Sequence, residues 1–275
     1  MKIMVNSIPK GGTHLLMKLV YLLGIRDDPR RFWLGAGQIK SGFETVNKIV
    51  KGSFTKPCVT IGSEVPVRVG TKWLERKIAR VPDGHSFGAH CRFSQPLLDV
   101  LNRNRVRVVC IIRDPRAIAA SHFHYIKQYE RHFYHNEYMA LSSDRERLRF
   151  SISGGTLGKY TIKSLVERYN EFQGWAMEDS VALVRFEDLI GEKGGGSSAN
   201  QRVAIERVAN ALSVETNEKT MEFITNELFG ESKKTRSDTF RKGQVGSWRT
   251  ELDRDLQQFL KLELSATLQQ WDYRD

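Results

Sequence analysis

A seven-residue apolar run, Val106–Ile112 (VRVVCII), constrains the fold of this chain more than any other segment. Most of its residues are β-branched, which is typical of a strand that is covered on both faces of a parallel sheet. Arg113, Asp114 and Pro115 interrupt the run, and apolar residues at helical spacing follow from Ala117. The segment therefore predicts a buried strand, a short loop and a helix, in that order.

The same order of strand, loop and helix recurs along the chain. Residues 2–6 predict a buried strand, and a helix is expected from Thr13 after a loop that contains prolines and glycines. Further strands are predicted at 58–61, 85–90 and 181–186, and further helices at 71–81, 159–175, 203–212, 220–229 and 252–268. This alternation predicts an α/β fold with a central, mostly parallel sheet flanked by helices. We expect residues 1–275 to form a single domain.

The charge and the cysteine content limit which partners and which cellular compartment fit this chain. The chain has 43 Lys and Arg against 32 Asp and Glu, a net charge of +11, which favours a polyanionic partner or serves solubility alone. Its three cysteines, Cys58, Cys91 and Cys110, form no CxxC pair and predict buried, reduced thiols. No apolar run reaches the ~18–20 residues that cross a bilayer, and the first residues do not resemble a signal peptide. We therefore expect a cytoplasmic protein without a transmembrane segment.

The first loop has the composition of an anion-binding site. Lys10, Gly11, Gly12, Thr13 and His14 lie between a predicted strand and a predicted helix. Glycines let the backbone approach a ligand closely, the helix start contributes positive potential, and lysine and threonine add donors. The loop is not a Walker A motif, because GxxxxGK[ST] is absent and the lysine precedes the glycines. The alternative is a tight turn with an exposed lysine.

Two further motifs contain basic residues, one at the end of a predicted strand and one next to a glycine. Arg113 ends the central strand and Ser121 follows eight residues later, so the two could grip a phosphate together. The alternative is a local ion pair between Asp114 and Arg116, with Ser121 facing solvent. Near the carboxyl end, Arg241, Lys242 and Gly243 form a basic turn, for which a solvated loop is the alternative interpretation. Neither motif is specific alone.

Together and in this order, the motifs resemble those of the sulfotransferases that use 3′-phosphoadenosine 5′-phosphosulfate (PAPS). The matching segments are Pro-Lys-x-Gly-Thr near the amino terminus, Arg-Asp-Pro-Arg with its serine, and Arg-Lys-Gly-x-x-Gly-x-Trp, which ends at Trp248. Val184 to Leu189 also resembles a family segment that follows a central strand. The resemblance implies a P-loop-kinase-like α/β domain without a metal. It also implies transfer of a sulfuryl group from PAPS to an acceptor hydroxyl, leaving adenosine 3′,5′-bisphosphate (PAP).

The resemblance also implies roles for individual residues. Lys10 to His14 would hold the 5′-phosphosulfate of the donor, with Lys10 stabilising the leaving phosphate. The 3′-phosphate would be bound by Arg113 and Ser121, and by a late loop made of Arg241, Lys242 and Gly243. His90 aligns with the histidine that serves as general base, a task that suits an imidazole with an ordinary pKa near 6.5.

The sequence departs from the family pattern in two places. Leu15 and Leu16 stand where many relatives have a tryptophan that stacks on adenine, which leaves Phe186 or Phe229 as candidates. Gly88 stands where those relatives have a lysine, two residues before His90. His14 is the rival for the general base. The acceptor could be a small molecule, a lipid, a saccharide or a tyrosine in a polypeptide, and the sequence does not indicate an oligomeric state.

Two other functions compete with the sulfotransferase hypothesis. A P-loop-like kinase would need a Walker lysine followed by Ser or Thr and a strand-end Asp for Mg²⁺, and neither is evident. A binding module for nucleic acid or an acidic glycan would account for the positive charge. However, no RNP motif, zinc-finger spacing or basic zipper region occurs, so we expect no nucleic-acid partner.

Overall fold

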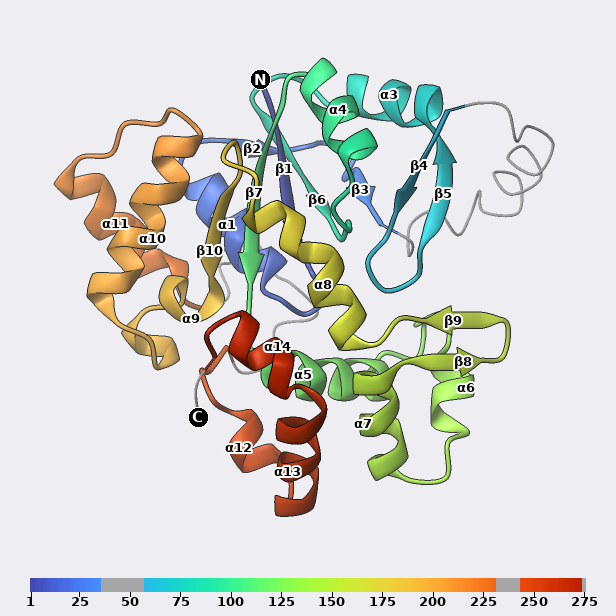
Figure 1. Ribbon diagram of the computed structural model, residues 1–275. Helices are drawn as coiled ribbons and strands as arrows, with labels where there is room; N and C mark the ends of the chain where they lie inside the picture. The colour runs from blue at the N-terminus through green and yellow to red at the C-terminus, as the bar shows by residue number, and fades with distance from the viewer. Residues whose placement is uncertain (36–56, 231–242, 274–275) are drawn as a thin grey trace.

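A parallel sheet forms the centre of the protein (Figure 1). The computed structural model describes residues 1–35, 57–230 and 243–273, and within them six strands make this sheet. The order is β10-β7-β1-β6-β2, with β3 also paired to β6, and every pairing is parallel. The strands are β1 (Lys2–Ser7), β2 (Arg26–Asp27), β3 (Trp33–Leu34), β6 (His85–Ala89), β7 (Val106–Ile112) and β10 (Ala182–Arg185).

Helices bury both faces of the sheet, which confirms the predicted α/β class. Alternate residues of β7 enter different cores: Val109 and Ile111 pack on one side, Val108 and Cys110 on the other. The first core contains α1 (Thr13–Leu22), α10 (Ser198–Ala211) and α11 (Glu218–Leu228). The second contains α3 (Thr71–Ala79), α4 (Gln95–Arg103) and α8 (Leu165–Ala176). This two-sided burial is the reason that the strand sequence lacks the usual polar alternation.

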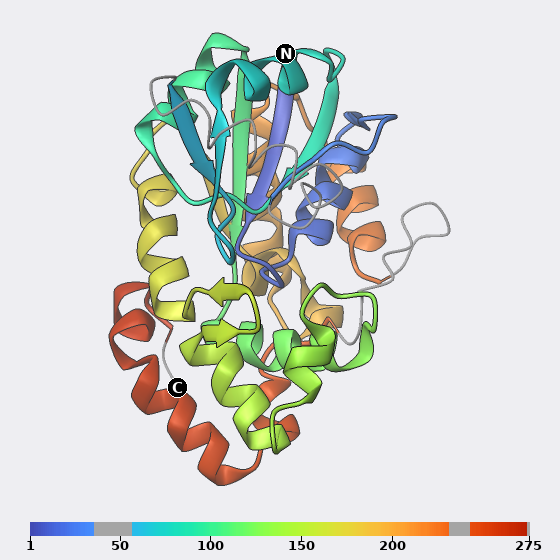
Figure 2. The ribbon, with the colours of Figure 1, turned by 90° about the vertical axis from the view of Figure 1, so that its right-hand side faces the viewer.

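The remaining helices lie beyond the carboxyl ends of the strands, at the bottom of Figures 1 and 2. They are α5 (Pro115–Gln128), α6 (His135–Met139), α7 (Asp144–Ser153), α12 (Trp248–Glu251), α13 (Arg254–Glu263) and α14 (Ser265–Gln270). The short helix α9 (Phe186–Leu189) and the 3₁₀ turn Glu192–Gly194 follow β10 directly. The loops that leave the strands therefore enter a space between the sheet and a second group of helices.

Two predicted helices are wrong in part. The segment 159–175 begins with a turn and strand β9 (Tyr160–Ile162), which pairs with β8 (Gly155–Leu157), and only then becomes α8. The segment 252–268 is divided into α13 and α14, because Leu264 leaves the helical conformation between them. A second hairpin, β4 (Cys58–Ile61) with β5 (Val67–Gly70), confirms the strand predicted at 58–61.

The three cysteines form no disulfide, as the sequence predicts. All three cysteines are free thiols, and Cys91 and Cys110 are buried as predicted, while Cys58 is partly exposed. Ser94 caps α4 with its hydroxyl, which accepts a hydrogen bond from the backbone N–H of Leu97. No helix among the described residues combines the length and the apolar character that spanning a bilayer requires.

Candidate active site

The loop between β1 and α1 places glycines where the backbone turns sharply. Lys10 and Gly12 have positive φ angles of 68° and 107°, and the N–H of Gly11 donates to Ile8 O at 2.9 Å. Gly12 also has no room for a side chain, since a Cβ there would lie 2.8 Å from Cδ2 of Phe186. Only glycine satisfies both conditions at position 12 without strain. The loop conformation is therefore fixed by the sequence.

This loop directs donors toward the space beyond the sheet. Within the described residues, the backbone N–H groups of Gly12, Thr13 and His14 donate to no other group. They form the open end of α1, where the helix dipole favours an anion. The Thr13 hydroxyl lies 2.5 Å from the Ser7 hydroxyl, and Lys10 Nζ lies 4.0 Å from the ring centroid of Tyr125. The loop thus has the donor set of an anion cradle.

Arg113 lies beside this loop. Strands β1 and β7 are neighbours with Ser7 opposite Ile111, so the two loops that follow them leave the sheet side by side. The guanidinium carbon of Arg113 lies 4.1 Å from the ring centroid of Phe186, the residue that touches position 12. The structure therefore brings the first two predicted motifs together. Ser121 is half-buried on α5, which starts directly after Arg113 and Asp114.

The late basic turn is described only in part. Arg241 and Lys242 lie outside the residues that the structure describes. Gly243 is described with a φ of 60°, and a Cβ on Gly194 would lie 2.9 Å from its carbonyl oxygen. The N–H of Val245 donates to Gly194 O at 2.8 Å. The end of the turn is thus anchored to the loop after α9, the helix that begins at Phe186.

His90 lies at the end of the neighbouring strand. Its Nδ1 is 3.0 Å from the backbone oxygen of Ser7, the last residue of β1, and a carbonyl can only accept, so Nδ1 carries the proton. Removal from water lowers the pKa of His90 to about 4; the Ser7 hydrogen bond opposes this shift, and the charges of His14 and Lys10 add to it. The ring is neutral at pH 7, and its Nε2 keeps a lone pair that can take up a proton.

The Trp33 ring contacts the rings of both candidate histidines, His14 and His90. The indole lies 5.1 Å from the His90 ring and 5.9 Å from the His14 ring, measured between centroids. It also covers Gly88, where a Cβ would lie 2.1 Å from the indole. This contact explains why the position carries glycine and no lysine. Sequence reasoning missed Trp33, because no motif or periodicity sets it apart from the irregular segment around it.

Phe186 and Phe229 were the two candidates for the adenine contact. Phe186 is only 5% exposed and is already in contact with Arg113 and position 12, so it has no open face for a base. Phe229 is half-buried and follows α11 at the edge of the core that includes α1. Its environment fits an adenine contact better, and this assignment stays a prediction.

A polar cluster that the sequence did not reveal forms around Glu64, whose neighbour Ser63 donates its N–H to His90 O. Glu64 Oε1 accepts hydrogen bonds from the Tyr134 hydroxyl and from His122 Nε2, the latter at 3.0 Å. The Nδ1 of His122 lies 2.9 Å from the Ser151 hydroxyl, and Arg168 Nη2 lies 3.8 Å from Glu64 Oε1. These residues come from five separate segments, so only the tertiary structure assembles them. No spacing in the sequence could have indicated the cluster.

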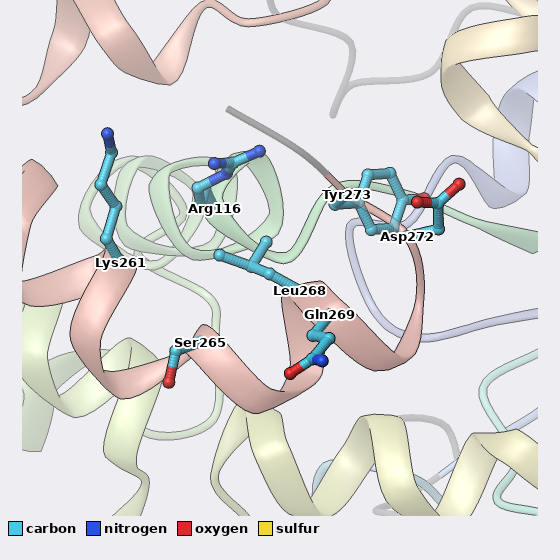
Figure 3. Close-up of a pocket in the computed structure, with 7 residues that line it drawn as sticks. All are labelled: Arg116, Lys261, Ser265, Leu268, Gln269, Asp272 and Tyr273. Atoms are coloured by element: carbon cyan, nitrogen blue, oxygen red, sulfur yellow. The ribbon is translucent and has the colours of Figure 1, made fainter.

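A separate cavity of about 570 Å³ lies between the first turn of α5 and helices α13 and α14 (Figure 3). Arg116, Lys261 and Tyr273 line it, and none of the predicted site residues does. Arg116 is held by Asp114 through an ion pair of 3.0 Å and lies over the Trp248 ring. The local ion pair considered from the sequence is therefore present. It anchors the start of α5 behind Arg113.

Comparisons with known proteins agree with this arrangement. No curated protein matches the sequence. The structure is similar to that of mouse sulfotransferase SULT7A1 complexed with PAP, with 16% identity, a TM-score of 0.60, and coverage of 98% of this chain and 84% of that one. It is also similar to retinol dehydratase with androsterone and inactive cofactor PAP (16% identity, TM-score 0.59, 100% and 82% coverage). A third match is retinol dehydratase with retinol and PAP (16%, 0.60, 100% and 83%).

At such identities, these structures show a shared fold. The sequence itself matches the family model described as "Sulfotransferase domain" over residues 1–272, nearly its full length. The matched range includes the glycine loop, the end of β7 and the late basic turn. We conclude that this chain belongs to the sulfotransferase domain family.

Proposed function

We propose that this sulfotransferase moves the sulfuryl group of PAPS to an acceptor hydroxyl by in-line transfer, with His90 as the general base. One observation carries the proposal. The Nδ1 of His90 donates to Ser7 O, the residue after which the anion-binding loop begins. His90 and the loop that would bind the anion are therefore both positioned by Ser7, the last residue of β1. Such a fixed relation between base and bound anion is what in-line transfer requires.

The residues around the loop fit a doubly phosphorylated donor. Lys10, Gly12, Thr13 and His14 would hold its 5′-phosphosulfate, since the N–H groups of the last three residues have no partner among the described residues. Arg113 lies on the adjacent strand end and, with Ser121, would hold the 3′-phosphate. We extend this pocket to Arg241, Lys242 and Gly243, supported by the position of the Gly243 carbonyl beside Gly194, in the turn after α9. The donor supplies an activated sulfur atom.

The chain's own groups then divide the chemistry between them. His90 Nε2 receives the acceptor proton while the acceptor oxygen bonds to sulfur and the bond from sulfur to the 5′-phosphate oxygen breaks. Lys10 and the N–H groups of Gly12 and Thr13 stabilise the charge that develops on that oxygen. His14 lies on the loop itself and keeps exposed surface. It therefore adjoins the leaving group, whereas His90 is reached from the opposite side of an in-line geometry.

The acceptor is proposed as a hydroxyl compound: a small molecule, a lipid or a saccharide. The solved relatives support the class, since the retinol dehydratase structures contain androsterone or retinol. We also propose that residues 1–275 act as one domain. A cytoplasmic location is proposed as well, supported by the free thiols of all three cysteines.

Nucleotide binding and turnover test the proposal separately. PAP at 100 times its Kd should stabilise the chain by about 2.7 kcal/mol in thermal unfolding, whereas ATP with Mg²⁺ should give no shift. Stabilisation by ATP with Mg²⁺ alone would favour a kinase. In a PAPS turnover assay, His90→Ala should lower kcat by about 10²- to 10⁴-fold, while His14→Ala should affect donor binding more than kcat. Near-normal turnover by His90→Ala would show that the base is misassigned.

A further inference from the structure

Glu64 is placed by the loop that joins β4 and β5. The N–H of Ser63, its neighbour, donates to His90 O at 3.0 Å, and the N–H of Lys163 donates to Glu64 O at 3.0 Å. The loop is thus held by one hydrogen bond to the residue after β6 and by another to the residue after β9. Glu64 follows directly on the residue that contacts the proposed base. It is also close enough for its charge to act on the imidazole, since Glu64 acts to raise the pKa of His90.

A row of rings also links Glu64 to the anion loop. The Tyr134 ring lies 4.4 Å from His132, and His132 lies 5.5 Å from Tyr125, measured between centroids. Lys10 Nζ in turn lies 4.0 Å from the ring centroid of Tyr125. Glu64 is therefore connected to His90 by one path and to Lys10 by another. The reacting centre lies between these two residues, so the carboxylate borders the space that an acceptor must enter.

Only one oxygen of this carboxylate is used inside the protein. Oε1 accepts from Tyr134 and His122, while Oε2 accepts no hydrogen bond from any described residue. The side chain keeps 12% of its surface exposed, whereas Tyr134 and Arg168 are fully buried. Burial acts to raise the pKa of Glu64, but the charges of Arg168 and His122 outweigh it and hold the pKa well below its usual range. Glu64 is therefore an anion with one unused acceptor.

An acceptor that buries Glu64 Oε2 displaces water from it. The acceptor must therefore donate a hydrogen bond in place of the one that water gave. An apolar alcohol offers no second donor, and burying the charge without one costs several kcal/mol. An ammonium group is not required either, because the buried guanidinium of Arg168 lies 3.8 Å from Glu64 Oε1 and balances its charge. A neutral hydroxyl fits both conditions, since it donates a hydrogen bond and adds no charge.

We propose that Glu64 selects a neutral polyhydroxy acceptor, one of whose hydroxyls is sulfated at His90 while a second donates a hydrogen bond to Glu64 Oε2. This inference rests on the proposed function and specifies its acceptor. Glu64 is a specificity-determining residue in this scheme and takes no part in moving the proton. A hydrogen bond to a charged group contributes about 1.5–3 kcal/mol, which corresponds to about 10- to 150-fold in affinity.

Three probes with the same alkyl chain test the inference by calorimetry on the PAP-bound chain. We expect hexyl β-glucoside to bind at least 10-fold more tightly than 1-hexanol or hexylamine. Glu64→Met, which keeps the side-chain length but removes the acceptor, should abolish this preference. Glu171→Met is the matched control, because Glu171 is similarly buried and ion-paired with Arg92 and Lys163 but lies outside the cluster. It should keep the preference for the glucoside.

Several results would overturn the inference. They are equal or tighter binding of hexanol, tighter binding of hexylamine than of the glucoside, an unchanged preference in Glu64→Met, or no binding of the glucoside to a chain that binds PAP. If Glu64→Met fails to bind PAP, and so has lost its fold, Glu64→Gln decides instead, with a reduced preference expected from the loss of charge. Failure of the wild-type chain to bind PAP would instead reject the proposed function.

Discussion

Replacing Gly88 with alanine should displace the Trp33 ring and destabilise the protein. A Cβ at position 88 would lie 2.1 Å from Cζ3 and 2.4 Å from Cε3 of Trp33, far inside van der Waals contact. Trp33 and Gly88 are register partners in paired strands, so the backbones cannot separate without breaking that pairing. The indole must therefore rotate away from both histidine rings.

The cost of this rotation can be worked from the contacts that are lost. Trp33 lies 5.1 Å from the His90 ring and 5.9 Å from the His14 ring. Each aromatic pair contributes about 0.5–1.5 kcal/mol beyond its buried area, so losing both costs about 1–3 kcal/mol. Overpacking a well-packed site generally costs the same, about 1–3 kcal/mol. We expect the free energy of unfolding of Gly88→Ala to fall by about 1–3 kcal/mol.

Urea unfolding followed by far-UV circular dichroism measures this loss without depending on the tryptophan signal. Gly70→Ala is the control, because a Cβ there meets nothing within 4 Å and φ is an ordinary −67°. It should change the free energy of unfolding by less than about 1 kcal/mol, since an N-cap penalty offsets the gain in backbone rigidity. In a Trp33→Leu background, Gly88→Ala should cost less than in the wild type. A loss below about 0.5 kcal/mol in the wild type would refute the packing argument.

Two further predictions concern charge. The pKa of His90 is about 4 in the folded chain and near 6.5 when unfolded, so the unfolded chain binds more protons between these values. The free energy of unfolding should therefore rise from pH 4 to pH 6.5, by about 2–3 kcal/mol more in the wild type than in His90→Gln; equal slopes in urea titrations would contradict this. Asp114→Ala removes the ion pair with Arg116, whose side chain is 2% exposed, and should cost about 3–5 kcal/mol in urea unfolding. The exposed Asp144→Ala should cost less than about 1 kcal/mol, and a similar loss in both variants would count against a special role for the buried pair.

The parts of the fold that local patterns specify could be predicted from the sequence. The strand Val106–Ile112 and the strand Cys58–Ile61 have the predicted bounds. Each of these elements is encoded by residues adjacent in the chain. The loop between the first strand and the first helix could be predicted for the same reason, because the positive φ of Gly12 is a property of the loop itself.

The parts that could not be predicted depend on contacts between distant segments. The helix predicted from residue 159 starts later because Tyr160–Ile162 pairs with another strand, a choice that local propensity does not settle. Trp33 gains its place only when β3 pairs with β6. Glu64 likewise becomes notable only beside His122, Tyr134 and Arg168, each supplied by another part of the chain.

The bond from His90 to Ser7 has a consequence for how the site responds to its ligands. The carbonyl that fixes the imidazole tautomer belongs to the residue whose hydroxyl lies 2.5 Å from Thr13 on the anion loop. With His90 as the proposed base, a shift of that loop on binding an anion would reach the imidazole through Ser7 alone. Occupation of the loop and orientation of Nε2 would then be coupled, so that the base would be aligned when a donor is bound.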